Sequence, residues 1–183
     1  MAKRMDALNA RLIKFIQDQK MFFVATAGAE GHVNLSPKGM DSFHVHDNQR
    51  VSWLNLTGSG NESAAHVLEN SRMTIMFCAF EGDPLILRLY GQARVVHPYD
   101  AGWQEALQPF GDMPGARQVF QLDVKIVQTS CGFAVPFYAY QEDRDLLNTW
   151  ANKKGPAGIE AYWQEKNTLS LDEKPTGILP EFK

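Results

Sequence analysis

A glycine-rich turn between a strand and a helix is the feature that most constrains this chain. Residues 51–56 read VSWLNL and predict a buried strand, and residues 57–61 (TGSGN) predict the turn that follows it. A helix is expected to begin near Glu62, with Asn61 or Ser63 as its cap. A second extended segment, residues 33–38, contains Pro37 at its end, which is typical of a strand terminus.

This turn predicts an anion site. Small residues at a helix N-terminus leave several backbone N–H groups unpaired, and the positive end of the helix dipole adds to their attraction for phosphate. Lys38, at the end of the neighbouring strand, would supply the countercharge. An ordinary loop before a capped helix is the alternative interpretation, and the glycines alone favour it.

Composition excludes several classes of protein. With 183 residues, 44% hydrophobic and 21% charged, the chain is expected to form one domain (1–183), with a helical arm from about residue 141. A net charge of −3 gives no electrostatic reason to bind nucleic acid or an anionic membrane. Because no apolar run could span a bilayer and no signal peptide is visible, a cytoplasmic location is expected. Cys78 and Cys131 lie in apolar surroundings and are expected to be buried, free thiols.

The remaining pattern predicts an antiparallel sheet with helices at both ends of the chain. Strands are expected at 22–26, from 32 onward as its hairpin partner, and at 72–80, 85–96 and 119–131. Helices are expected at 5–19, 142–153 and 158–166, the last two separated by Gly155-Pro156. About six strands joined mostly by hairpins favour a small antiparallel barrel over a doubly wound sheet.

The strand at 85–96 alternates strictly between apolar and polar residues. One face carries Arg88, Tyr90, Gln92 and Arg94. This face could be a solvated surface, and it would equally suit a subunit interface or the rim of a ligand site.

Other sites for catalysis or metal binding are weakly indicated. Ser36 has no nucleophile elbow around it, which argues against a hydrolase. His44 and His46 share a strand face at the spacing of a two-histidine metal site, but no matching carboxylate or thiol accompanies them. A polar outer face is therefore the preferred interpretation, and no metal is expected.

Four segments together resemble the FMN-binding split-barrel family related to pyridoxamine 5′-phosphate oxidase. They read VNLSPKGMDSF, VSWLNLTGSGNESAAHVLEN, RMTIMFCAFEGDPLILRLYGQARVV and TSCGFAVPFY, and the later DRDLLNTWANKKGPAGIEAYWQEKNTLSLD fits as well. The resemblance implies a mainly β fold with flanking helices, an antiparallel split β-barrel that forms a homodimer with FMN at its interface.

The resemblance also implies the residues that would hold the cofactor. The matching positions for the phosphate are Lys38 and the turn, where Thr57, Ser59, Gly60, Asn61, Glu62 and Ser63 lie. The flavin ring would lie along Val33, Asn34, Leu35 and Ser36. Arg88 and Gln92 are further candidates that could reach the cofactor across a dimer.

The chain also departs from the family's authentic oxidases. Those oxidases carry basic residues where this chain has Asn61-Glu62-Ser63, and they carry an Arg-x-His element where this chain reads GILPEFK. The expected function is therefore transfer of hydride or electrons through FMN, from a nicotinamide donor or a small organic substrate other than pyridoxamine 5′-phosphate. The alternative from a different class is a non-catalytic carrier or sensor of flavin or deazaflavin.

Overall fold

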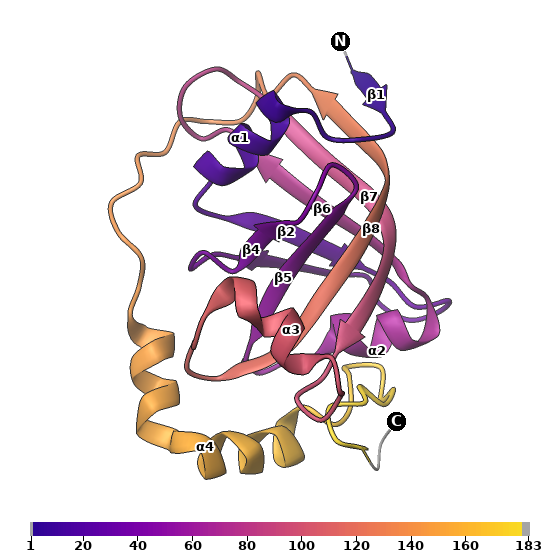
Figure 1. Cartoon of the computed structure of the whole chain (residues 1–183), viewed down its shortest axis with the longest axis vertical. Helices are drawn as coiled ribbons and strands as arrows, with labels where there is room; N and C mark the ends of the chain where they lie inside the picture. The colour runs from indigo at the N-terminus through magenta and orange to yellow at the C-terminus, as the bar shows by residue number, and fades with distance from the viewer. Residues whose placement is uncertain (1, 181–183) are drawn as a thin grey trace.

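Eight antiparallel strands form a single curled sheet in the computed structural model, which describes residues 2–180 (Figure 1). The strands are β1 (Lys3–Met5), β2 (Phe22–Thr26), β3 (Asn34–Lys38), β4 (Phe43–Val45), β5 (Arg50–Leu56), β6 (Arg72–Cys78), β7 (Ile86–Val96) and β8 (Ala116–Ser130). The helices are α1 (Ala10–Asp18), α2 (Glu62–Glu69), α3 (Trp103–Leu107) and α4 (Leu146–Lys166), with a short 3₁₀ turn at Gln108–Phe110. The predicted mainly β fold with flanking helices is confirmed.

The strand order explains why the barrel is split. The sheet runs β3-β2-β6-β7-β8-β5-β4, with β1 added on β8. β3 and β4 are the two ends of this path and do not pair with each other. The sheet is curled (Figure 1), and residues of β3, at one end of the path, and of β5, next to the other end, line the pocket of the candidate site.

Aromatic packing fills the interior of the curled sheet. Trp53 on β5 stacks on Phe120 on β8, with ring centroids 4.5 Å apart and planes 6° apart. Phe22, Phe43 and Phe77 pack around them edge to face or at a tilt. The amphipathic α1 closes one end of this core with Leu12 and Ile16.

A second, smaller core lies on the other face of β5 and β8. Leu54 and Val119 pack there against Trp103 and Ala106 of α3. Because β5 is covered on both faces, all of its residues from Val51 to Asn55 are buried.

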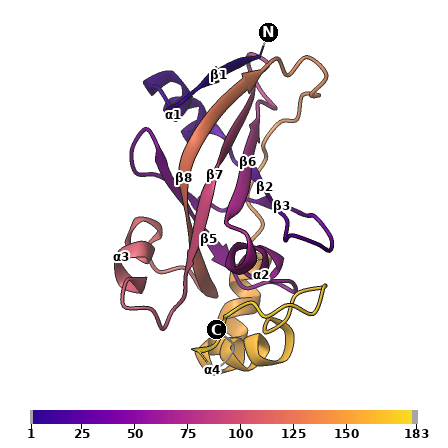
Figure 2. The same ribbon diagram turned by 90° about the vertical axis from the view of Figure 1, so that its right-hand side faces the viewer.

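The last third of the chain forms an arm. After β8, residues 131–145 run along the outside without regular structure, and α4 then lies at the same end of the sheet as α2 (Figures 1 and 2). Gly155, at φ 65°, kinks α4 before Pro156, as expected from that dipeptide. The segment after α4 is irregular as expected, yet Thr176 and Ile178 are buried.

Several predicted boundaries were wrong. The first helix begins at Ala10, because Lys3–Met5 pairs with β8 and the Asn9 side chain caps the helix. The helix expected from Glu142 begins at Leu146. The estimate of about six strands missed two three-residue strands, β1 and β4. Residues 181–183 of the predicted tail lie outside the described residues.

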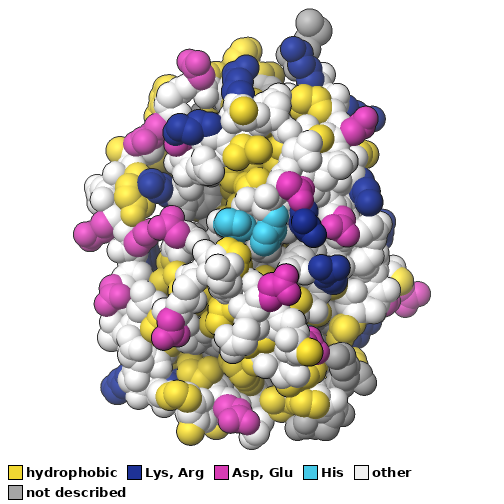
Figure 3. All heavy atoms as spheres, in the orientation of Figure 1, with side chains coloured by type: hydrophobic (Ala, Val, Ile, Leu, Met, Phe, Trp, Pro, Cys, Tyr) yellow, Lys and Arg dark blue, Asp and Glu magenta, His cyan; other side chains and the backbone are white. Residues whose placement is uncertain are grey.

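The cysteines follow the prediction in part. Cys78 and Cys131 are both free, and Cys78 is buried, but Cys131 is exposed because β8 ends at Ser130. The face shown in Figure 3 carries basic and acidic side chains interspersed, without a broad patch of either sign. In the described part of the chain, no helix is long and apolar enough to cross a bilayer.

Candidate anion site at the opening of the barrel

The alternation of β3 turns one row of its side chains into the opening. Asn34, Ser36 and Lys38 line a pocket of about 290 Å³ there. The Lys38 ammonium group lies 5.1 Å from the centroid of the Trp53 ring and donates a long hydrogen bond of 3.4 Å to Asn55 Oδ1. Lys38 thus bridges from β3 to β5, across the gap in the sheet.

The predicted glycine-rich turn forms the opposite wall of this pocket. Its lining includes the turn residues 58–61 and the first residues of α2, Glu62 and Ser63. Helix α2 begins at Glu62, as expected, with Asn61 in the cap position. Asn61 does not cap with its side chain; its Nδ2 instead donates to the Asn167 carbonyl at 3.3 Å.

Arg117 is the principal site residue that sequence reasoning missed. Between β5 and β8 the register shifts, so that Asn55 pairs with Gln118 and Leu56 with Ala116. Arg117 is the extra residue in this bulge and has no partner in the ladder. Its side chain lines the pocket while the residue remains only 2% exposed.

The guanidinium group of Arg117 fixes the position of the turn by two hydrogen bonds to its backbone. It donates to the carbonyl oxygens of Gly58 (3.3 Å) and Gly60 (3.0 Å). In a trans peptide the N–H points opposite to the C=O, so these bonds turn the N–H groups of Ser59 and Asn61 away from Arg117. Neither N–H donates to another backbone group in the described residues. The result is a row of outward-facing donors of the kind that binds anions.

The electrostatics of the pocket favour an anion. Burial, with a smaller contribution from the positive charge of Arg117, lowers the pKa of Lys38 to about 8. Burial lowers the pKa of Arg117 to about 9. Neither cation forms a salt bridge among residues 2–180, and Arg117 Nε is buried without a hydrogen-bond partner there.

Glu62 is the only carboxylate among the residues that line the pocket. Its Oε2 accepts a hydrogen bond of 2.9 Å from the backbone N–H of Leu171, which holds the carboxylate toward the C-terminal segment. Arg117, which is buried, and Lys38, which is half-buried, form no salt bridge within residues 2–180, and a phosphate dianion would fit between such charges.

Ser63 is already part of a buried chain of polar groups. Its hydroxyl lies 3.1 Å from that of Thr26, which in turn lies 3.1 Å from His66 Nδ1. Asn34 Nδ2 donates to the Ser63 hydroxyl at 3.2 Å, so this network links β3 to the first turn of α2. His66 is a buried residue of this network.

The other predicted cofactor residues do not line this pocket. Thr57 packs behind the turn, where it accepts from Trp163 Nε1 and donates to the Gly115 carbonyl, both at 2.8 Å. Leu35 points outward and is 64% exposed. Arg88 donates to Ser130 on the neighbouring strand.

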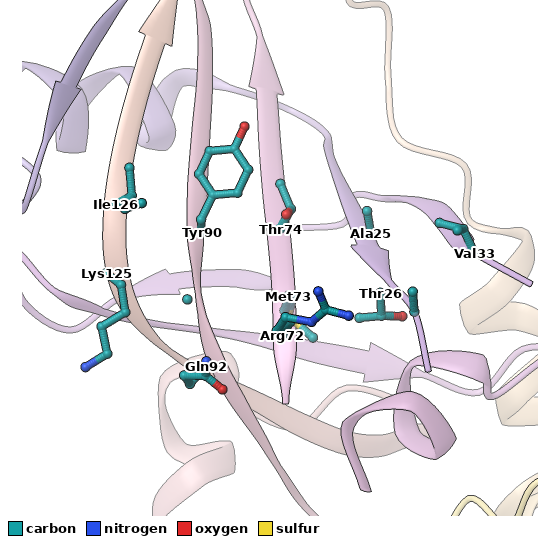
Figure 4. Close-up of a pocket in the computed structure, with 12 residues that line it drawn as sticks. Ala25, Thr26, Val33, Arg72, Met73, Thr74, Tyr90, Gln92, Lys125 and Ile126 are labelled. Carbon is teal, nitrogen blue, oxygen red and sulfur yellow. The ribbon is translucent and has the colours of Figure 1, made fainter. Parts of the chain in front are cut away.

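Val33 and Gln92 belong to a separate cavity of about 490 Å³ on the outer face of the sheet (Figure 4). Its walls are the side chains of β2, β6, β7 and β8, with Arg72, Tyr90 and Lys125 among them. Ser71 and Gln92 are hydrogen-bonded at its edge. The polar face predicted for residues 85–96 thus borders a hollow surface.

The two histidines predicted to share a strand face do so. The rings of His44 and His46 lie 4.7 Å apart, and His46 Nε2 is 2.9 Å from the Ser52 hydroxyl. No group of three or more His, Cys, Asp or Glu side chains that could hold a metal occurs within residues 2–180.

Comparison with known proteins gives a consistent family. Residues 8–131 match the sequence profile of pyridoxamine 5′-phosphate oxidase. The pyridoxamine 5′-phosphate oxidase family protein ustO of Aspergillus flavus is 39% identical, over 93% of this chain and 76% of its own length.

Solved structures share the fold at lower sequence identity. A candidate pyridoxamine 5′-phosphate oxidase from Lactobacillus delbrueckii is 21% identical, with a TM-score of 0.53, over 67% of this chain and 94% of its own. HupZ of Group A Streptococcus is also 21% identical, with a TM-score of 0.52, over 65% of this chain and 92% of its own.

Proposed function

Because the chain belongs to the pyridoxamine 5′-phosphate oxidase family, we propose that it is a homodimeric flavoprotein that binds FMN at the opening of its barrel. The observation that carries this proposal is the presence in one pocket of Arg117, which is buried, and Lys38, which is half-buried, with no ion pair to a carboxylate within residues 2–180 for either. A buried cation is costly unless a ligand or partner compensates its charge. The FMN phosphate would provide that compensation.

The turn and Lys38 would hold the phosphate, and Arg117 would support them. Lys38 would approach from β3 and the N–H groups of residues 59–61 from the helix end, while Arg117, on the other side of the turn, would fix the turn and add its positive charge. The family's oxidases place basic residues at the positions of Asn61 to Ser63. In this chain, Arg117 would replace part of that charge from another strand.

The flavin ring would lie along β3. This strand is the end of the sheet path, so one side of its backbone is free of strand partners. Its N–H and C=O groups could then meet the polar edge of the ring, with Asn34 and Ser36 on the pocket side. Arg88 and Gln92 would contribute only from a second copy of the chain, because neither lines this pocket.

The exposed apolar surface supports a homodimer. Val33 is 74% exposed beside β3, and Phe133 and Phe137 in the segment after β8 are 82% and 80% exposed. Large aromatic side chains at this level of exposure are typical of interaction sites. A second copy would cover them and the cavity of Figure 4.

We propose an oxidoreductase, with a nicotinamide or a small organic molecule other than pyridoxamine 5′-phosphate as the partner of the flavin. FMN, when bound, supplies hydride or electron transfer. The residues of the chain bind and orient it and shield it from water. The alternative is a carrier or sensor of flavin or deazaflavin. It is favoured by the pocket itself, whose titratable side chains are Lys38, Arg117 and Glu62, because each is already hydrogen-bonded to another residue of the protein and none stands ready as a general acid or base.

Titration of the purified protein with FMN, riboflavin and a deazaflavin phosphate tests the binding. We expect FMN to bind more tightly than riboflavin, which lacks the phosphate. Equal affinity for the two would contradict the anion assignment.

Anaerobic addition of NADH or NADPH to the FMN complex then separates the two functions. Bleaching of the flavin absorbance supports an oxidoreductase. An unchanged spectrum with these and other organic donors supports a carrier. If the deazaflavin phosphate binds more tightly than FMN, the deazaflavin becomes the proposed cofactor.

A further inference from the structure

We propose that Asn167, in the C-terminal arm, is a positioning residue that orients the phosphate-binding turn. The inference rests on the proposed function and extends it to a residue beyond the part of the chain that matches the family profile, residues 8–131. Asn167 ends α4 and is completely buried, against the turn at residues 58–60. Figure 2 shows α4 and α2 at the same end of the sheet.

The side chain of Asn167 holds the turn and Arg117 at the same time. Its Nδ2 donates to the carbonyl oxygens of Gly58 at 3.0 Å and Ser59 at 3.3 Å. Its Oδ1 accepts from Arg117 Nη1 at 2.8 Å. One amide group therefore uses both of its ends at this site.

The backbone of Asn167 is anchored as well. Its carbonyl oxygen accepts from Asn61 Nδ2 and from the Thr176 hydroxyl. These bonds restrain the position of the side chain, so the amide can impose a geometry on the turn that the turn would not adopt alone.

The consequence for an anion follows from peptide geometry. Asn167 and Arg117 together bind the carbonyl oxygens of three successive residues, Gly58, Ser59 and Gly60. The N–H groups of the same three peptide bonds, those of Ser59, Gly60 and Asn61, must then point the opposite way. If these carbonyls were released, a flexible glycine turn could rotate them toward the pocket, where their partial negative charge would repel a phosphate.

Two further contacts bracket the turn from the same arm. Trp163 Nε1 donates to Thr57 Oγ1 before the turn, and the Leu171 N–H donates to Glu62 Oε2 after it. Asn167 lies between them in sequence and contacts the turn between them in space. The arm thus completes a site whose cations come from the barrel.

The test is the affinity ratio of FMN to riboflavin in Asn167→Leu, which has a similar volume but no amide. We expect the dissociation constant for FMN to rise at least tenfold and that for riboflavin to stay within twofold. A purely structural loss would weaken both ligands alike. Asn152→Leu, an exposed asparagine of α4, is the matched control and should leave both constants unchanged.

Asn167→Asp separates the two ends of the amide. It keeps an acceptor for Arg117 but loses the Nδ2 donors to Gly58 and Ser59, and it adds a negative charge. We expect a loss of FMN affinity at least as large as in Asn167→Leu. Melting temperatures are measured for each variant to show that it folds. If Asn167→Leu does not fold, Asn167→Ser replaces it in the comparison.

The outcomes distinguish the two proposals. If the unmodified protein prefers FMN to riboflavin and every folded Asn167 variant keeps that preference, the role of Asn167 is refuted while the anion site stands. If the unmodified protein shows no such preference, the FMN proposal fails. Titration with inorganic pyrophosphate, followed by ³¹P NMR, then decides: weaker binding in the variants supports the role of Asn167, and unchanged or absent binding refutes it.

Discussion

Arg117 and Lys38 face the same pocket from two strands that are not neighbours in the sheet, and the charge of Arg117 helps to lower the pKa of Lys38. The like charges are brought together although burial disfavours each of them. Such an arrangement destabilises the empty protein and favours the binding of an anion. It therefore makes opposite predictions for stability and for affinity.

Replacing Lys38 by Met should show both effects. Met preserves packing on Trp53 but removes the charge. We expect FMN affinity to fall about 10- to 100-fold, as for loss of one charge-assisted contact of roughly 1.5–3 kcal/mol. The ligand-free variant should melt at a higher temperature than the unmodified protein, because the charged form is disfavoured in the fold. Lys153→Met, on exposed α4, should change neither quantity; unaltered FMN binding in Lys38→Met would refute the assignment.

The pH dependence of binding should follow the free Lys38 ammonium. Its pKa of about 8 means that the cation is present below pH 8 and is lost above it. FMN affinity should therefore be nearly constant from pH 7 to 8 and then fall, by at most about tenfold per pH unit. Lys38→Met should lack the part of this decline between pH 8 and 9, below the pKa of about 9 of Arg117. Isothermal titration in buffers of different ionisation enthalpy should also detect proton uptake on binding above pH 8.

The same pKa predicts the contribution of Lys38 to stability. Below pH 8 the lysine is charged in both the folded and the unfolded protein, and the full cost of burying the charge is present. Between pH 8 and 10.5 the unfolded state binds more protons, so this contribution to the free energy of unfolding rises with pH. The contribution of Lys38 is the difference in the free energy of unfolding between the unmodified protein and Lys38→Met, measured by urea denaturation at several pH values. A difference that does not shrink as pH rises would contradict this expectation.

Arg117 should be more sensitive than Lys38 to substitution. Arg117→Leu would leave the carbonyls of Gly58 and Gly60 and the Asn167 amide oxygen without this donor, at roughly 1–3 kcal/mol for each group that stays buried and unpaired. We expect a lower melting temperature and loss of the preference for FMN over riboflavin. Arg117→Lys keeps the charge but not the fork of donors, and it should recover only part of either property. Full recovery in Arg117→Lys would show that charge alone matters.

The exposed aromatic residues after β8 should be needed for dimerisation. Phe133→Ser combined with Phe137→Ser is expected to shift the protein from dimer to monomer in sedimentation velocity experiments, with little effect on its melting temperature at low concentration. Leu171→Ser, at a leucine that is 72% exposed outside this segment, is the control and should leave the dimer intact. An unmodified protein that is monomeric at all concentrations would overturn the dimer proposal.

Local patterns predicted the parts of the site that are close in sequence. The hairpin from Phe22 and the start of α2 at Glu62 were predicted correctly, because each depends on residues that are close together in the sequence. Lys38 was expected beside the glycine-rich turn as part of a neighbouring strand. The pocket contains both, but β3 and β5 are not neighbours in the sheet and meet only through its curvature.

Residues that reach the site only through the tertiary structure could not be predicted from local patterns. Arg117 begins a long alternating strand and looks like a solvated charge; only its position in the bulge turns it inward. Asn167 lies at the end of a helix with no local signal beyond a polar terminus. The bulge is recognised only from the pairing of Asn55 with Gln118 and of Leu56 with Ala116, and that pairing is known only from the structure.

The sequence by itself thus determined the six longer strands and the glycine-rich turn before α2, since short-range periodicity and turn chemistry specify these features, and it singled out Lys38 as one cation beside that turn. Tertiary structure alone decided that the second cation is Arg117 and that Asn167 holds the turn. Both depend on groups more than 50 residues from the turn, which meet it only once the barrel has curled and the arm has packed against its end. Burial then gives these polar groups their effect, because it removes the water that would otherwise satisfy them.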